Sequence, residues 1–360
     1  MTPEEARAAF PVLRRLAYLN AGSEGPLARP TLDAMAAAQA EDADLGRGST
    51  AYVERLLALR ERVRAQVGRL LGVGAERVAL TGSTSDSVRI VVAGLRIGPG
   101  DEVVTTATEH FSLVGLLHAS GASVRAVPVL GRSTEDALDA LVAAVTPRTR
   151  LVALQHVSWM TGQIFPVEEL KAATGLPVLV DGAQSAGAIP VDASRYDFYT
   201  ASLQKWSCGP DGTGALVVAD PDGLPVAAPG HLAKRRFDPD GRFEPKEGAP
   251  RFDWGWLGTP TLAGLEAALA FHPDWRYARA AEMTTRCREL LGARFELLGE
   301  PGHGTLVTIR PRGESGELVA RALEHGVVIR DIPETGLVRV SCGYWTSDGD
   351  LERLEEALRR

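Results

Sequence analysis

Cysteine is scarce in this sequence, and long apolar runs are missing from it. The 360 residues include three cysteines, Cys208, Cys287 and Cys342, which are too few for the disulfide framework of a small secreted domain. No apolar run approaches the about 18 residues that cross a bilayer. The amino terminus, MTPEEARAAF, has two glutamates and no apolar core typical of a signal peptide. We therefore expect a cytoplasmic protein that has no contact with membrane.

An excess of positive charge is also missing. Lysine and arginine number 39 against 46 acidic residues, so the formal net charge is −7. The strongest basic run is Lys234-Arg235-Arg236, and a run of that length is usually solvated surface. Nucleic-acid binding needs a clustered basic surface, so we expect no nucleic-acid partner. We predict no metal site either.

Short β-rich runs alternate with helical patterns along much of the chain, which indicates an α/β fold with a mainly parallel sheet. Because 45% of the residues are hydrophobic, the chain can bury a substantial core. The predicted strands are Arg77–Thr81, Glu102–Thr105, Val124–Pro128, Leu151–Gln155, Pro177–Val180, Phe198–Ala201 and Ala215–Val218. The predicted helices between them are Ala51–Leu71, Ser85–Leu95, Phe111–Ala119 and Thr134–Val145.

Residues 227–258 have poor periodicity and are rich in Gly, Pro, Arg and aromatics. A loop of that length inside a compact protein is usually functional. Helical patterns follow at Thr261–Phe271 and Trp275–Leu291, then two strand candidates and a closing helix from Asp348. We expect a large domain at 19–264 and a smaller α+β domain made of 1–18 and 265–360.

Two strands of the predicted sheet run into polar residues. Asp181 ends the first, and Lys205 follows the second 24 residues later. Ligands of doubly wound sheets bind just beyond the carboxyl ends of the strands, so both side chains are expected at one crevice. A buried ion pair is the simpler interpretation. Ser202 and Gln204, which can donate to an oxyanion, and the glycine-rich run 209–214 favour a ligand site instead.

A second anion-friendly feature is Thr81-Gly-Ser-Thr-Ser85, which follows a strand and opens a helix. Free N–H groups and the helix dipole bind phosphate at such a position. An ordinary Ser or Thr N-cap explains the same residues. The segment lacks the spacing of a P-loop, and the Gly212–Gly214 region is not a dinucleotide fingerprint.

Together these residues resemble the class V aminotransferase group of fold-type I enzymes that depend on pyridoxal 5′-phosphate (PLP). That group includes cysteine desulfurases, cyst(e)ine C–S lyases and isopenicillin N epimerase-like proteins. The resemblance runs from Tyr18-Leu-Asn20 to Arg339-Val-Ser-Cys-Gly-Tyr-Trp and is most specific in VDGAQSAG and SLQKWSCGPDGTGAL. It implies a mainly parallel seven-stranded sheet in the large domain.

The resemblance also implies roles for the cofactor residues. Lys205 would carry PLP as a Schiff base and later move the Cα proton. Asp181 would keep the pyridinium nitrogen protonated, and Gln184 would bond the phenolic oxygen. His110 matches the residue that stacks on the cofactor ring, with a surface histidine as the alternative. Phosphate would be held by Thr84, Ser85, Ser202 and Gln204.

Three further positions follow from the same match. Thr259 corresponds to a threonine that reaches the phosphate of a neighbouring subunit, which implies a homodimer with shared active sites. A plain turn before a helix that starts with Pro260 is the alternative. Arg339 corresponds to the arginine that binds the substrate carboxylate through its planar fork, and Asn20 is placed beside the substrate.

Departures from the family pattern decide the expected reaction. Desulfurases have a nucleophilic cysteine on a loop just before the carboxylate-binding arginine, and residues 330–337 contain none. Gln204 replaces a histidine that usually precedes the lysine. Trp159 stands where desulfurases have asparagine, as in cyst(e)ine C–S lyase-like sequences, and would form an apolar wall at the substrate unless it is a core residue.

We therefore predict a PLP-dependent lyase that eliminates sulfur from the Cβ atom of cysteine, cystine or a related amino acid. An epimerase or aminotransferase acting on an amino acid or small peptide is the first alternative. A cysteine desulfurase is less favoured because the loop cysteine is missing. A protein that binds PLP without turnover is the remaining alternative.

Overall fold

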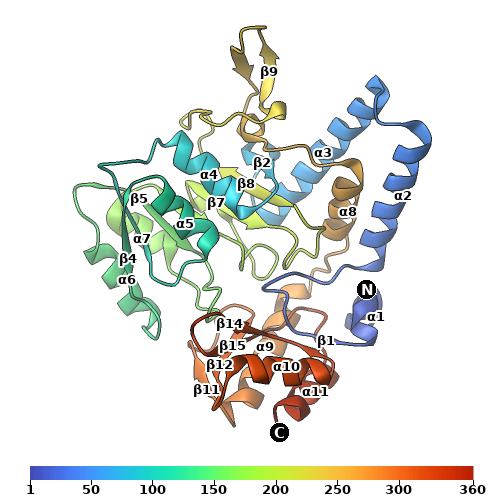
Figure 1. Ribbon diagram of the computed structural model, residues 1–360, viewed down its shortest axis with the longest axis vertical. Coiled ribbons are helices and arrows are strands. Elements are labelled where there is room, and N and C mark those ends of the chain that lie inside the picture. The colour runs from blue at the N-terminus through green and yellow to red at the C-terminus, as the bar shows by residue number, and fades with distance from the viewer. Residues whose placement is uncertain (360) are drawn as a thin grey trace.

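A seven-stranded sheet forms the centre of the larger part of the molecule (Figure 1). The computed structural model describes residues 1–359. In spatial order the strands are β2 (Val78–Thr81), β8 (Gly214–Val218), β7 (Phe198–Ser202), β6 (Val178–Asp181), β5 (Thr149–Gln155), β3 (Glu102–Thr106) and β4 (Ser123–Val127). β8 runs antiparallel to both of its neighbours, and the other pairings are parallel. The predicted mainly parallel seven-stranded sheet is confirmed.

Helices cover both faces of this sheet, which explains why its strands are apolar throughout. One face packs against α3 (Thr50–Leu71), α6 (Thr134–Ala143), α7 (Val167–Thr174) and α8 (Thr259–Ala270). The other packs against α4 (Thr84–Gly94) and α5 (Phe111–Ala119). Leu80 and Ala79, neighbours in β2, belong to the two opposite cores. Burying a leucine or valine in this way stabilises the fold by about 1.5–3 kcal/mol.

A four-stranded antiparallel sheet forms the smaller part, below the large sheet in Figure 1. Its order is β11 (Glu296–Leu298), β12 (Leu306–Arg310), β15 (Leu337–Ser341) and β14 (Arg330–Ile332). The helices of this part are α9 (Arg276–Gly292), α10 (Ser315–Glu324) and α11 (Asp348–Leu358). A separate parallel pair joins β1 (Ala17–Tyr18) to β13 (Val327–Val328). The two strand candidates expected here were therefore an undercount, because most of these strands are two or three residues long.

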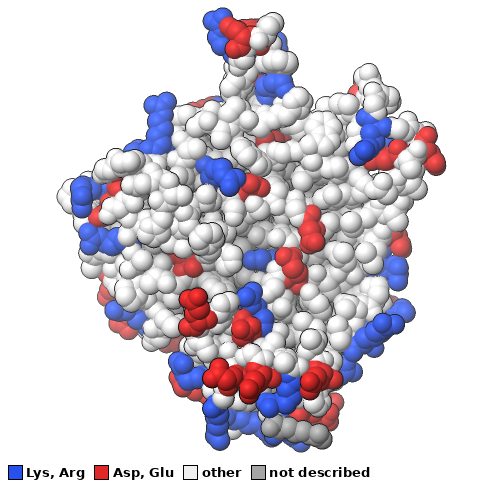
Figure 2. All heavy atoms as spheres, viewed as in Figure 1, with Lys and Arg blue, Asp and Glu red and all other residues white. Residues whose placement is uncertain are grey.

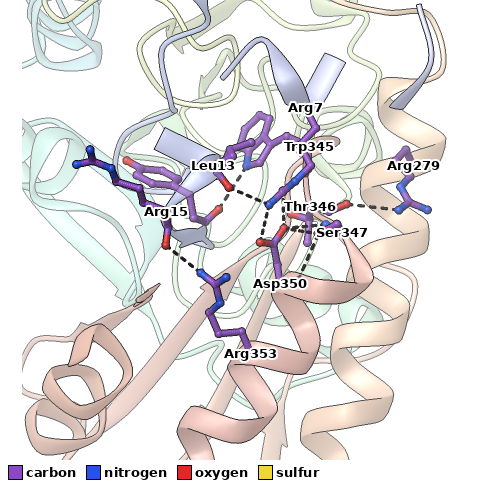
Figure 3. Close-up of polar contacts among 10 residues, drawn as sticks. Arg7, Leu13, Arg15, Arg279, Trp345, Thr346, Ser347, Asp350 and Arg353 are labelled. Carbon is purple, nitrogen blue, oxygen red and sulfur yellow. Dashed lines mark hydrogen bonds and ion pairs between the residues drawn. The ribbon is translucent and has the colours of Figure 1, made fainter. Parts of the chain in front are cut away.

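The amino-terminal segment is attached to the smaller part by polar contacts (Figure 3). Arg7, on α1 (Pro3–Ala8), contacts both carboxylate oxygens of Asp350 at 2.6 and 2.8 Å and also donates to the carbonyl of Trp345. Arg353 of α11 donates to the Arg15 carbonyl at 2.9 Å. These contacts agree with placing residues 1–18 in the smaller domain. The expected boundary after residue 264 falls inside α8, and the division into domains stays a prediction.

Residues 227–258 are not the structureless loop that the sequence suggested. They contain a β-hairpin, β9 (Lys234–Phe237) paired with β10 (Phe243–Pro245), which projects at the top of Figure 1. Ion pairs such as Arg236–Glu244 at 2.8 Å join its two strands. Because the two strands are rich in charged residues, they lack the usual alternation of apolar and polar side chains, and the sequence did not predict the hairpin. On the face drawn in Figure 2, basic and acidic groups are interspersed.

Asp253 closes this segment with a buried charge cluster. Its carboxylate accepts from Arg64 at 2.8 and 2.9 Å, from Arg60 at 3.0 Å and from the Leu80 N–H at 2.9 Å. All three charged side chains are at most 1% exposed. The cluster joins α3 to β2, the strand that leads into the Thr81–Ser85 turn.

Among residues 1–359, no helix combines the length and apolarity of a membrane span.

Candidate active site

Asp181 and Lys205 come together because β6 and β7 are neighbours. The two strands run parallel, with Asp181 paired to Thr200, and Lys205 lies in the turn that follows β7. One carboxylate oxygen of Asp181 accepts from the Ala183 N–H at 2.9 Å, and both Asp181 and Lys205 line the floor of a cavity. The expected crevice beyond the strand ends is thus present.

The cavity opens to a pocket of about 330 Å³, a size that suits a small ligand. Nine of the predicted site residues line the pocket or its floor in addition to Asp181: Thr84, Ser85, His110, Trp159, Gln184, Ser202, Gln204, Lys205 and Arg339. They come from the large sheet, from its helices and from the smaller sheet. The structure therefore gathers residues spread over more than 250 positions of the chain.

The start of α4 forms the anion-binding end of the pocket. Ser83 is the N-cap, and its hydroxyl accepts from the Asp86 N–H at 3.1 Å. Thr84 and Ser85, the first helical residues, are left with N–H groups at the positive end of the helix dipole. Thr84 and Ser202 share a hydroxyl hydrogen bond of 2.8 Å. The capping and phosphate-binding interpretations are compatible, because a different residue serves each.

One further polar atom at this end lacks a protein partner. The side-chain carbonyl of Gln204 is buried and, among the described residues, accepts no hydrogen bond. Because this oxygen can only accept, it indicates a water molecule or another donor beside it in the functional state. A phosphate group, held by the helix start and the surrounding hydroxyls, fits the donors at this end.

His110 and Trp159 form an aromatic wall of the pocket. Their rings meet edge to face, with centroids 5.4 Å apart. His110 is the N-cap of α5, and its Nδ1 accepts from the Ser112 N–H at 3.2 Å. Burial, followed by the nearby charge of Lys205, lowers the pKa of His110. The ring is therefore neutral at pH 7 and carries its proton on Nε2, a form suited to lying over a planar cofactor.

The amine of Lys205 is easier to deprotonate than that of an ordinary lysine. Burial lowers its pKa to about 8, although the charge of Asp181 opposes this shift and Arg339 adds to it. A neutral amine is the form that attacks a carbonyl or accepts a proton. Lys205 therefore combines accessibility from the pocket with a usable fraction of free amine near neutral pH.

Two arginines occupy the opposite end of the pocket. Arg330 and Arg339 pair directly across β14 and β15, so their side chains share one face of the smaller sheet. Arg339 donates to the Trp159 carbonyl at 2.8 Å, and Arg330 donates to the Ser23 hydroxyl at 3.1 Å. Burial and the neighbouring Arg330 lower the pKa of Arg339, to about 9. This pair is a strong site for an anionic group.

Asn20 and Gln184 have supporting contacts. The side-chain oxygen of Asn20 accepts from the Ser23 hydroxyl at 2.9 Å and lies 3.5 Å from a guanidinium nitrogen of Arg339. Asn20 therefore helps to orient Arg339. Gln184 donates to the Gly22 carbonyl at 2.8 Å and accepts from the Trp206 indole at 2.9 Å. Its amide keeps one further hydrogen for the pocket.

Thr259 lies away from the pocket of its own chain. It is the first residue of α8, is 3% exposed and donates its hydroxyl to Asp42 on α2 (Arg29–Leu45). The Gly258 N-cap provides no side-chain cap, so the start of α8 keeps free N–H groups. The role of Thr259 towards a neighbouring subunit stays a prediction.

Sequence reasoning missed several residues of the site, namely Ser23, Glu24, Glu109, Gln155 and Arg330. Arg330 was noted only as the start of a segment without cysteine. Its nine-residue separation from Arg339 fits two strands joined by a turn. This spacing could have indicated that the two arginines lie on paired strands, but it does not determine which residues of the two strands face each other.

The three thiols are all buried, and among the described residues none lines the pocket. Burial raises the pKa of Cys208, which makes its thiol a poor nucleophile. Cys342, expected inside a strand, directly follows β15 and is fully buried. These positions agree with the absence of a desulfurase-type loop cysteine from the sequence.

Comparison with known proteins defines the family. The sequence model of the family "Aminotransferase class-V" matches residues 17–330. Isopenicillin N epimerase of Streptomyces clavuligerus is 29% identical over 99% of this chain and 97% of its own length. A cysteine desulfurase of Enterobacter sp. (strain 638) is 34% identical over 74% of this chain and 71% of its own.

Solved structures agree with this result. A lysine-to-alanine mutant of C-DES, with glycine covalently linked to the PLP cofactor, superimposes with a TM-score of 0.90 at 28% identity, covering 98% of each chain. The complex of the cystine C–S lyase C-DES with its product cysteine persulfide gives 0.89 at 28% identity, covering 97% of this chain and 98% of that one.

The chain belongs to the class V aminotransferase family. It is a PLP-dependent enzyme of fold type I, and its cofactor is pyridoxal 5′-phosphate. The pocket fits the cofactor along its length. A helix start with free N–H groups lies at one end, an amine and a carboxylate lie on the floor, and an aromatic wall stands beside them.

Proposed function

We propose that this enzyme is a C–S lyase that cleaves cystine or a closely related sulfur amino acid by β-elimination. The observation that carries the proposal is the cross-strand pair Arg330 and Arg339 at the substrate end of a PLP pocket. One guanidinium suits the α-carboxylate. The second suits a carboxylate on the leaving half of the substrate, which cystine has and cysteine lacks.

Each step of the reaction has a residue suited to it. Arg339 holds the α-carboxylate, and Trp159, whose indole donates to the Thr108 carbonyl at 2.9 Å, provides an apolar surface for the sulfur chain. PLP, when bound, would withdraw electrons from Cα, and Asp181 would keep its ring nitrogen protonated. Lys205 Nζ takes the Cα proton. The Cβ–S electron pair then leaves with the persulfide sulfur, and the three-carbon remainder hydrolyses to pyruvate and ammonium.

Glu24 supports a substrate with a zwitterionic distal half. Glu24 lines the pocket together with Arg330. Burial followed by the charge of Asp211 raises the pKa of Glu24, and a bound ammonium would oppose that shift by stabilising the ionised form. An acid in this position can accept from the distal ammonium of cystine while Arg330 binds the distal carboxylate. Cysteine would leave both groups without a partner, which favours the disulfide as substrate.

We also propose that the enzyme acts in the cytoplasm as a homodimer with shared active sites, with 19–264 as the large domain and the remainder as the small one. The uncapped start of α8 supports a phosphate contact in the partner, through Thr259. Because the Thr259 hydroxyl already donates to Asp42, the backbone N–H groups at this helix start are the donors available to that phosphate.

The decisive experiment incubates the holoenzyme with cystine and, separately, with cysteine, and measures pyruvate, ammonium and persulfide sulfur. We expect pyruvate in proportion to persulfide from cystine and in proportion to sulfide from cysteine, with cystine the better substrate. Release of alanine without pyruvate would show desulfurase chemistry and contradict the proposal. The Lys205→Ala variant is the control for reaction outside the site.

An epimerase is the second candidate, because isopenicillin N epimerase of Streptomyces clavuligerus resembles this chain over 99% of its length. Epimerisation needs Cα proton removal and return without loss from Cβ. Incorporation of solvent deuterium at Cα of an amino acid or small peptide, with no pyruvate formed, would support it. Transfer of the amino group to a 2-oxo acid would instead indicate an aminotransferase.

A further inference from the structure

Glu109 fills the gap where β3 and β5 separate. The two strands pair in parallel up to Val104 and Val152, and beyond that point their main chains have no ladder contact. Glu109, three residues after the end of β3, accepts from the Thr106 hydroxyl at 2.6 Å and from the Gln155 N–H at 3.0 Å. Its carboxyl group therefore replaces a backbone partner at the strand ends, directly before His110.

Gln155, the last residue of β5, continues the connection. Its amide nitrogen donates to both the carbonyl and the hydroxyl of Thr108, each at 3.1 Å. Its amide oxygen accepts from the Trp159 N–H at 2.8 Å. The Trp159 indole returns a bond of 2.9 Å to the Thr108 carbonyl. Gln155 is 3% exposed, so these bonds form in a region with little competing water.

The same connection reaches both ends of the aromatic wall. His110 follows Glu109 directly and packs edge to face on Trp159. The Trp159 carbonyl accepts from Arg339 at 2.8 Å. A shift of Gln155 would therefore move the His110 loop, the Trp159 loop and the guanidinium together.

We propose that Glu109 and Gln155 are positioning residues that hold His110 and Trp159 in register around the PLP ring, with Glu109 acting as a neutral acid. Burial and the nearby charge of Asp181 support the neutral form, since they raise the pKa of Glu109 to about 8. As a neutral acid, Glu109 would carry its proton on the oxygen that lies 2.6 Å from the Thr106 hydroxyl and donate it there, the reverse of the direction in which the ionised group accepts. Asp181 would then be the carboxylate that pairs with the ring nitrogen of bound PLP.

Purified holoenzyme variants test this directly. Glu109→Gln preserves both contacts, because its amide oxygen can accept from the Gln155 N–H while its amide nitrogen donates to the Thr106 hydroxyl. Glu109→Ala removes them. Gln155→Met keeps the volume of the side chain and removes its hydrogen bonds. Glu102→Ala is the matched control, since Glu102 is also buried but lies at the other end of β3, bound to Thr146 and Thr149.

The measurements are PLP affinity and the circular dichroism of bound PLP, which reports the asymmetry of the groups around the ring. We expect Gln155→Met and Glu109→Ala to weaken PLP binding by about tenfold and to alter the dichroism at equal occupancy. Glu109→Gln should match the parent enzyme within about twofold. Glu102→Ala should lower the melting temperature and leave the dichroism unchanged.

Three results would overturn the proposal. Native affinity and dichroism in Gln155→Met would show that the connection positions nothing. An equal change in Glu102→Ala would show general loosening of the fold. A Glu109→Gln variant that behaves like Glu109→Ala would show that the carboxylate charge is needed. If Glu109→Ala fails to fold, the PLP affinity and dichroism of Gln155→Met still test the proposal. No substrate enters these measurements, so they do not depend on whether the C–S lyase proposal holds.

Discussion

Replacing Lys205 by methionine should make the PLP-free protein more stable at neutral pH, although it abolishes catalysis. Burial is the first cause that lowers the pKa of Lys205, from 10.5 to about 8. Below pH 8 both the folded and the unfolded chain carry this proton, and the folded state bears the cost of burying the charge. Methionine has a similar length and no charge, so it removes that cost.

The size of the effect follows from the pKa difference. A difference of about 2.5 pKa units corresponds to roughly 3 kcal/mol, which is an upper bound because the lysine side chain keeps some contact with solvent in the pocket. As the pH rises from about 8 towards 10.5, the folded protein has released the proton while the unfolded chain still holds it. Stability of the parent therefore increases with pH over this window, and the advantage of the variant disappears above it.

Urea unfolding of the two PLP-free proteins, at pH 7 and at about pH 10, measures this difference. We expect the variant to be about 2–3 kcal/mol more stable at the lower pH and less than about 1 kcal/mol more stable at the higher one. A variant no more stable at pH 7, or an advantage that persists unchanged at pH 10, would refute the reasoning. Groups remote from Lys205 titrate equally in both proteins, so their contribution cancels in the comparison.

Two further predictions concern charged residues, one in the substrate pocket and one in the buried charge cluster. Arg330→Met should lower kcat/KM for cystine by roughly tenfold to a hundredfold, mainly through KM, because a charge-assisted hydrogen bond contributes about 1.5–3 kcal/mol. Steady-state kinetics with cystine and with cysteine measure this. An equal loss of kcat/KM for both substrates would contradict the prediction. Asp253→Asn leaves Arg60 buried without a counter-charge and Arg64 with Glu61 as its remaining acidic partner, so it should cost about 3–5 kcal/mol of unfolding free energy. A loss below about 1 kcal/mol in urea titration would show that the two guanidinium groups find other partners.

The large sheet was predictable from the sequence, because strands buried on both faces are continuous apolar runs. All seven predicted strands agree with the structure to within two residues, as does the helix start at Phe111. α2 was missed for a physical reason. Its residues 29–45 are rich in alanine and exposed acid, and few of them are buried, so no apolar stripe identifies the helix. Its contact with α8, a long-range feature, keeps it in place.

The cofactor half of the site was also predictable, because its residues follow strands in order along the chain. Thr84 and Lys205 each lie just beyond a strand end of the same sheet, and Asp181 is the last residue of β6. The substrate half of the site was only partly predictable. The cross-strand pairing of Arg330 with Arg339 depends on register, and residues 22–25 reach the pocket only through the tertiary fold.

Residues 20–25 join the two halves of the site. A Cβ atom at Gly25 would collide with the Lys205 carbonyl oxygen, and one at Gly22 would lie 2.7 Å from a nitrogen of Arg339. Gly25 N–H also donates to the Gln204 carbonyl at 2.8 Å. This short segment thus contacts the Lys205 turn and Arg339 directly. Because α1 is held to α11 by Arg7 and Asp350 (Figure 3), the chain that leads into this segment is anchored on the smaller part.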